Sequence, residues 1–198
     1  SFIEEHPSPT ARDDAITLNV GKLSLIVPAN FIVYRSARQG GDRKDLALFT
    51  TYPDFHGYTQ GDAQAFTSNA ADAPVIYMLI RKESVSITEA QRLKRIYMAY
   101  VTDPAGTPGP FGLTQYVFRD DSGYRGEDLF VGNQDGKPIV MRCVRFSQEV
   151  PSPSCLRDIR LIKGVALSYR FKRANLAHWQ EIAEGVEGLI KSFEERAK

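Results

Sequence analysis

Hydrophobic and polar positions alternate along the chain from residue 15 onward. Ile16, Leu18 and Val20 are apolar and are separated by polar residues, which is the two-residue period of a half-buried strand. A Gly-Lys dipeptide divides this run from the apolar segment 23–27. Because glycine accepts a positive φ in a tight turn, the two runs are predicted to form a hairpin with a type II′ turn.

The next segments alternate between polar loops and short apolar runs. Residues 31–34 are expected to extend the second strand, and the polar segment 36–45 to form an exposed loop. Strand 46–51 and a short helix over 61–69 follow. The segment 75–80 is apolar at every position apart from a tyrosine, which favours a central strand covered on both faces.

A middle helix is predicted to begin after Thr88. Thr88 and Gln91 have capping-box spacing, and the apolar residues that follow fall at helical intervals up to Tyr100. The segment 103–112 contains three prolines and three glycines, so it ends this helix.

The C-terminal half has short apolar runs separated by turns, followed by one long helical stripe. Consecutive strands with short links favour an antiparallel meander, here over 113–119, 124–131, 137–147, 156–162 and 165–171. From Leu176 to Phe193 apolar residues recur every three or four positions, which predicts an amphipathic helix docked on this meander. Gly185 and Gly188 lower its intrinsic stability, so we expect them to pack closely against a strand.

These elements indicate an α+β fold, built mainly from an antiparallel sheet with a C-terminal β-meander. The long C-terminal amphipathic helix and the middle helix are expected to pack on that sheet. Residues 1–13 have no period and contain two prolines, and we interpret them as a flexible tether to a single domain over residues 14–198. A signal peptide, a membrane anchor and a cloning tag are the alternatives for what preceded Ser1.

Composition and charge exclude several classes of protein. The 198-residue chain is 42% hydrophobic, as in ordinary globular domains, and has a formal net charge of +1. It therefore lacks an overall field toward nucleic acid, and it has no basic stripe interleaved with aromatic residues, so nucleic acid is not an expected partner. No stretch approaches the roughly 20 apolar residues that span a bilayer.

Cys143 and Cys155 are the only cysteines, and they lie on neighbouring predicted strands. A hairpin would place them opposite each other, at a separation that a disulfide tolerates. The alternative is a pair of small buried thiols in a reducing cytoplasm. Because structural disulfides are typical of oxidising compartments, we favour a periplasmic or extracellular protein, with a cytoplasmic one as the alternative.

His56 is the strongest candidate for catalysis. It lies between Asp54 and Tyr58 in a polar and aromatic loop after a predicted strand. A histidine beside a carboxylate can act as a general base near neutral pH. Asp54 could equally cap the turn without any catalytic role.

Arginines are the candidates for ligand binding. Arg92 and Arg95 lie one turn apart on the middle helix, while Arg142 and Arg145 share one strand and face opposite ways. Arg157, Arg160 and Arg170 belong to the last two predicted strands. If some of these arginines converge, their guanidinium groups could hold carboxylate or phosphate. Ordinary pairing with acidic side chains is the alternative.

Motifs of several enzyme classes are missing. The chain has no G-x-S-x-G elbow, no phosphate-binding glycine loop and no zinc-ligand spacing, so no cofactor and no metal site are predicted. Glu127 and Asp128 fall in the middle of a predicted strand, where one must face inward and needs a cationic partner.

These patterns favour an exported, envelope-associated domain that binds a protein or a small anionic ligand and is not an enzyme. The expected partner is another envelope protein, and an upstream segment would anchor the domain to a membrane. The alternative is a small hydrolase or transferase that uses His56 and Asp54. The sequence leaves substrate, partner, strand order and oligomeric state open.

Overall fold

The computed structural model describes residues 4–198, which form an α+β domain with a large antiparallel sheet. Its eight strands lie in the order β4-β5-β11-β10-β9-β8-β7-β6. The last six are consecutive in the chain, so the predicted C-terminal meander is confirmed. The bounds are β4 (Asp45–Thr51), β5 (Val75–Lys82), β6 (Thr107–Pro108), β7 (Thr114–Val117), β8 (Glu127–Gln134), β9 (Lys137–Val144), β10 (Ser154–Ile162) and β11 (Val165–Lys172).

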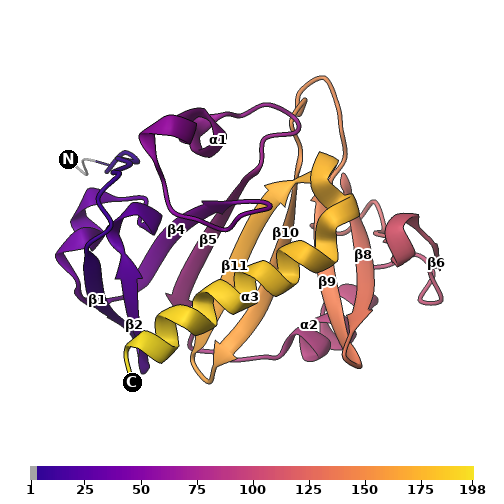
Figure 1. The fold of residues 1–198 in the computed structure, drawn as a ribbon. Coiled ribbons are helices and arrows are strands. Elements are labelled where there is room, and N and C mark those ends of the chain that lie inside the picture. Colours follow the sequence, from indigo (N-terminus) through magenta and orange to yellow (C-terminus); the bar gives the residue numbers. More distant parts are fainter. Residues whose placement is uncertain (1–3) are drawn as a thin grey trace.

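A smaller sheet lies beside the β4 edge, in the order β2-β1-β3 (Figure 1). The predicted hairpin is present as β1 (Ala15–Val20) and β2 (Leu23–Pro28). Residues 31–34 do not extend β2, because the chain turns into the 3-10 helix Ala29–Phe31 directly after Pro28. The expected loop 36–45 instead contains a 3-10 helix, Arg35–Gln39, and β3 (Gly41–Arg43), which pairs in parallel with β1.

The C-terminal helix α3 (Trp179–Arg196) runs across one face of the large sheet (Figure 1). Its inward side chains, among them Ile182, Val186 and Phe193, are almost completely buried and share one core with Leu167 and Phe171 of β11. Each such side chain contributes about 1.5–3 kcal/mol by leaving water. The prediction of a docked amphipathic helix is therefore confirmed.

The two glycines of α3 differ in their surroundings. A Cβ atom on Gly185 would overlap the ring of Phe55, so the close approach predicted here exists, but to a loop and not to a strand. At Gly188 a Cβ atom would have no neighbour within 4 Å, and the expected close packing is wrong there.

The opposite face of the large sheet is covered only at its two ends. Near β4, Phe49 packs with Phe66 of α1 (Ala63–Thr67), and near β8, Leu129 packs with Tyr97, which follows α2 (Glu89–Arg95). The capping box predicted at Thr88 is present at the start of α2.

Between these two covered ends, the sheet faces outward, and we call this region the open face. Tyr77 and Leu79 of β5 lie on it and are 44% and 36% exposed. The expectation that this strand is covered on both faces is therefore wrong at Leu79, whereas α1 still reaches Tyr77, whose hydroxyl donates to the Phe66 carbonyl at 3.3 Å.

Residues 4–13 contain no helix or strand. The Ser8 amide nonetheless donates to the Val33 carbonyl at 2.9 Å, and the Ser36 hydroxyl donates to Glu5 at 2.6 Å. The flexibility assigned to this segment stays a prediction.

Candidate functional site

A disulfide joins Cys143 of β9 to Cys155 of β10, as the hairpin geometry predicts. The two residues are direct cross-strand partners, and both are completely buried on the face of the sheet that packs against the core. The bond therefore lies within the hydrophobic core, where its role is structural.

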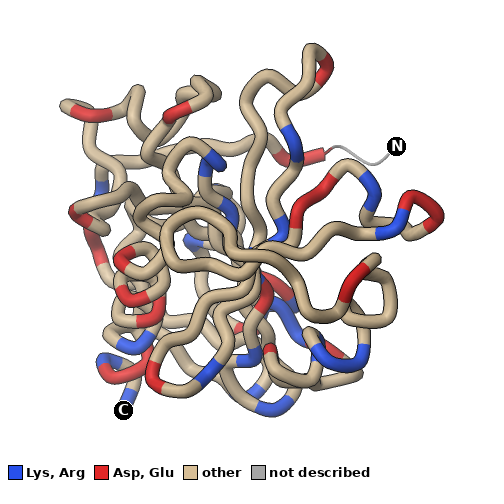
Figure 2. Tube along the Cα trace, turned by 90° about the vertical axis from the view of Figure 1, so that its right-hand side faces the viewer, with Lys and Arg blue, Asp and Glu red and all other residues tan. Residues whose placement is uncertain are grey.

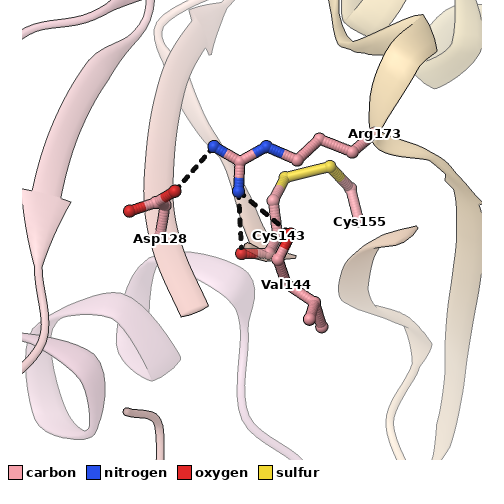
Figure 3. Close-up of a disulfide and its surroundings, with 5 residues drawn as sticks. All are labelled: Asp128, Cys143, Val144, Cys155 and Arg173. Atoms are coloured by element: carbon pink, nitrogen blue, oxygen red, sulfur yellow. Dashed lines mark hydrogen bonds and ion pairs between the residues drawn. A yellow bond between two sulfur atoms is a disulfide. The ribbon is translucent and has the colours of Figure 1, made fainter. Parts of the chain in front are cut away.

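Arginine side chains surround the inward acid beside the disulfide. Asp128 pairs with Cys143 across β8 and β9, and it is 5% exposed. Its carboxylate lies 2.6 Å from Arg173 and 3.0 Å from Arg145, and Arg173 also donates to the carbonyl oxygens of Cys143 and Val144 (Figure 3). The inward acid has the cationic partners that its strand position requires.

A second charged cluster separates β9 from β10 beyond the disulfide. The two strands pair at only two positions, after which the Glu89 carboxylate of α2 enters between them. It accepts from the Val140 amide at 2.8 Å and from Arg157 of β10 at 2.8 and 2.9 Å. Arg157 is 3% exposed and also donates to the Tyr169 hydroxyl at 3.1 Å, and burial raises the pKa of Tyr169 to about 12.

A cavity of about 740 Å³ adjoins this ion pair, between the start of α2, the β8–β9 turn and α3. Its lining includes the apolar side chains of Ile139 and Ile159 and the charged side chains of Lys137, Arg160 and Glu184. Because acidic and basic groups are mixed in its lining, the cavity does not favour anionic over cationic ligands.

A groove of about 440 Å³ lies on the open face. Tyr77, Arg170, Leu156 and Arg142 are successive cross-strand partners from β5 to β9 and form one row along it. Aromatic, aliphatic and guanidinium groups thus alternate across four strands, a composition that is enriched at protein interfaces.

The Arg142 guanidinium forms one wall of this groove. It lies 4.9 Å from the ring centre of Tyr124 and 5.7 Å from that of Tyr97, both of which offer a cation–π contact. Glu127 accepts from Arg142 Nη1 at 2.8 Å. Arg142 Nε is buried without a hydrogen-bond partner among residues 4–198.

The neighbouring row of the open face carries a hydrogen-bonded network. Asp158 accepts from the Ser168 hydroxyl and lies 3.8 Å from Arg81, which in turn pairs with Glu83 at 3.0 Å. The one acidic residue that lines the groove is therefore already engaged within the domain.

The catalytic candidates do not come together as the sequence suggested. His56 Nε2 lies 3.0 Å from Asp62, while Asp54 is exposed, and His56 Nδ1 lies 2.7 Å from the Gly57 carbonyl. Tyr58 stacks against aromatic neighbours. Both ring nitrogens of His56 therefore lie beside acceptors of its own part of the chain, Asp62 and the Gly57 carbonyl.

The four candidate arginines are spread over different parts of the domain. Arg142 faces the open side, and Arg145 reaches Asp128 beside the disulfide. Arg92 and Arg95 belong to α2. Arg170 and Arg81 also lie on the open face, and of these two the sequence pointed only to Arg170. The sequence signal that could have placed them there is that each directly follows an apolar residue that faces the core.

Basic and acidic residues are interspersed along the chain (Figure 2). None of the helices within residues 4–198 is long and apolar enough to cross a bilayer. In the same range, no three His, Cys, Asp or Glu side chains are grouped so that they could hold a metal ion.

Comparison with known proteins identifies the fold but no family. No protein family matches the sequence, and no curated protein resembles it in sequence. An immunity protein of the Stenotrophomonas maltophilia type IV secretion system has a similar structure, with a TM-score of 0.64 and 17% identity over 91% of this chain and 93% of that one. The iron-regulated outer membrane lipoprotein FrpD of Neisseria meningitidis is also similar, with a TM-score of 0.56 and 16% identity over 98% of both chains.

Proposed function

We propose that this protein is an exported binding module that acts without catalysis, by holding another protein of the bacterial envelope on its open face. The open face carries this proposal. It exposes Tyr77 and Leu79 beside Arg170 on the second and third strands of the large sheet, at interior positions that a second layer usually covers. Exposed aromatic and arginine side chains in one patch are characteristic of protein interaction sites.

The disulfide supports export. Buried structural disulfides persist in oxidising compartments and are rare where thiols are kept reduced. We therefore propose a periplasmic or extracellular location, with a cytoplasmic location as the alternative. The similar folds of an immunity protein and an outer membrane lipoprotein support an envelope role and a protein partner by analogy.

The competing proposal is a small hydrolase or transferase that uses His56. The contact between His56 and Asp62 favours it, since a carboxylate can orient a catalytic imidazole. Against it stands the second contact of the ring, which engages Nδ1 with the Gly57 carbonyl. Binding through the open face accounts for the exposed Tyr77, Leu79 and Arg170, which a catalytic His56 does not. A small anion bound on this face is a further alternative to a protein.

Site-specific photo-crosslinking in cells of the source organism tests this proposal. A photoreactive residue replacing Leu79 should form a covalent adduct with a second protein, because Leu79 lies on the open face. The same residue at Lys191, exposed on α3, is the matched control and should form none. No adduct at Leu79, or equal adducts at both positions, would contradict binding through this face.

A further inference from the structure

Arg170 occupies the centre of the open face without a partner of its own. It is exposed on β11, between Tyr77 of β5 and Leu156 of β10, and it takes part in none of the ion pairs found within residues 4–198. Its guanidinium offers five N–H donors in a planar fork that matches a carboxylate. A free fork of this kind at the middle of a groove is suited to an acidic group from outside.

Arg142 provides a second positive group in the same row. Leu156 separates it from Arg170, so the two arginines lie two strand spacings apart, about 10 Å. Glu127 accepts two hydrogen bonds from Nη1 of Arg142, so an incoming carboxylate would share this guanidinium with Glu127. The side chain is 18% exposed, on the wall of the groove.

The groove has one unpaired positive charge within residues 4–198, on Arg170, because Arg142 is already paired with Glu127 and Arg81 with Glu83. Its charged lining consists of Arg81, Arg142, Arg170 and Asp158. Asp158 is already hydrogen-bonded to Ser168 and faces Arg81, so it offers little to an external cation. An acidic group that enters the groove can therefore accept hydrogen bonds from Arg170. A basic group that enters finds no free carboxylate in the groove lining.

We propose that the open face recognises an acidic segment of its partner protein, with one carboxylate on Arg170 and a second about 10 Å away on Arg142. Apolar side chains of the same segment pack on Tyr77 and Leu79. This inference rests on the proposed function and specifies the chemistry of the partner. A protein segment is favoured over a small anion because exposed apolar side chains lie beside the two arginines, whose backbone positions are two strands apart.

Selection from a random 12-residue peptide display library tests this chemistry on the full chain. Peptides that bind the wild-type protein should be enriched in Asp and Glu, and Arg170→Glu should weaken their binding by about tenfold or more, since charge reversal places a carboxylate opposite a carboxylate. Arg160→Glu is the matched control, because Arg160 is exposed on β10 but lines the other cavity. It should leave binding within about twofold.

Three results would overturn the inference. They are selected peptides with no acidic enrichment, acidic peptides that bind Arg170→Glu as well as wild type, and binding of free succinate or glutarate without binding of acidic peptides. Unchanged melting of Arg170→Glu shows that the variant is folded.

The crosslinking experiment separates this inference from the proposed function. If Leu79 crosslinks to a partner and Arg170→Glu leaves the adduct unchanged, the acidic chemistry is wrong while binding through the open face stands. If Leu79 forms no adduct, the proposed function itself fails.

Discussion

Arg157 and Glu89 form a two-point ion pair in the gap between β9 and β10, with Nη2–Oε1 and Nε–Oε2 distances of 2.8 and 2.9 Å. The pair joins α2 to the sheet at the point where two strands separate. Because Arg157 is almost completely buried, removing its partner would leave a charge in the protein interior.

Glu89→Gln is expected to lower the free energy of unfolding by about 3–5 kcal/mol, the usual cost of removing one member of a buried ion pair, since the remaining partner, Glu187, is half-exposed and holds Arg157 by one contact. Urea denaturation measures this loss. Glu187→Gln is the control, because Glu187 lies 3.4 Å from Arg157 with its side chain 45% exposed. Its loss should stay below about 1 kcal/mol, and equal losses in the two variants would contradict a special role for Glu89.

Tyr169 should make the domain less stable in alkali. Its pKa is about 12 in the folded protein and about 10 when unfolded, so between these values the folded state holds the proton that the unfolded state has released. Stability is therefore unaffected by this group below about pH 10 and falls as pH rises toward 12. Urea denaturation across this range should show a smaller fall in Tyr169→Phe, and an identical slope in both proteins would refute the assignment.

The disulfide should form in protein isolated under native conditions and resist reductant until the domain unfolds. Both cysteines are completely buried, so a reductant can reach the sulfurs only after unfolding. Intact mass after reduction with and without denaturant measures this as the gain of two hydrogens. Replacing both cysteines by alanine should cost about 3 kcal/mol. Free thiols in the native protein would contradict the assignment.

Alanine at the two glycines of α3 should have opposite effects. Gly185→Ala places a methyl group against the ring of Phe55 and should lower the melting temperature. Gly188→Ala meets open space and should raise stability by about 0.5–1 kcal/mol through helix propensity. Thermal unfolding of the two variants provides the comparison. A destabilised Gly188→Ala would show that this position is constrained after all.

Local patterns predicted most of the fold. The period of the residues from Leu176 to Phe193 was enough to identify α3, and the Thr88–Gln91 spacing was enough to identify the start of α2. The disulfide followed from two cysteines on adjacent strands. In each case the signal lies within one element or one hairpin, where chain connectivity limits the alternatives.

The candidate site depends on contacts between distant segments, and these are where sequence reasoning was weakest. Glu89 and Arg157 are 68 residues apart, and neither has a pattern that identifies the other. The partner of His56 is Asp62 and not Asp54, because the loop direction is set by packing around Phe66. The open face was missed because an apolar strand next to an edge has the same sequence pattern as a fully covered one.

Because β9 and β10 pair over only two positions, the large sheet consists of two four-stranded halves that few backbone hydrogen bonds connect. One of these halves carries the N-terminal part of the domain and the last two strands, and the other carries the rest of the meander. A force that pulls β9 and β10 apart is resisted by the Cys143–Cys155 disulfide at one end and by the Glu89–Arg157 ion pair at the other. A continuous ladder of backbone hydrogen bonds is absent between these two strands. Reduction of this one cysteine pair would leave the β9–β10 boundary to two cross-strand positions and to the Glu89–Arg157 ion pair.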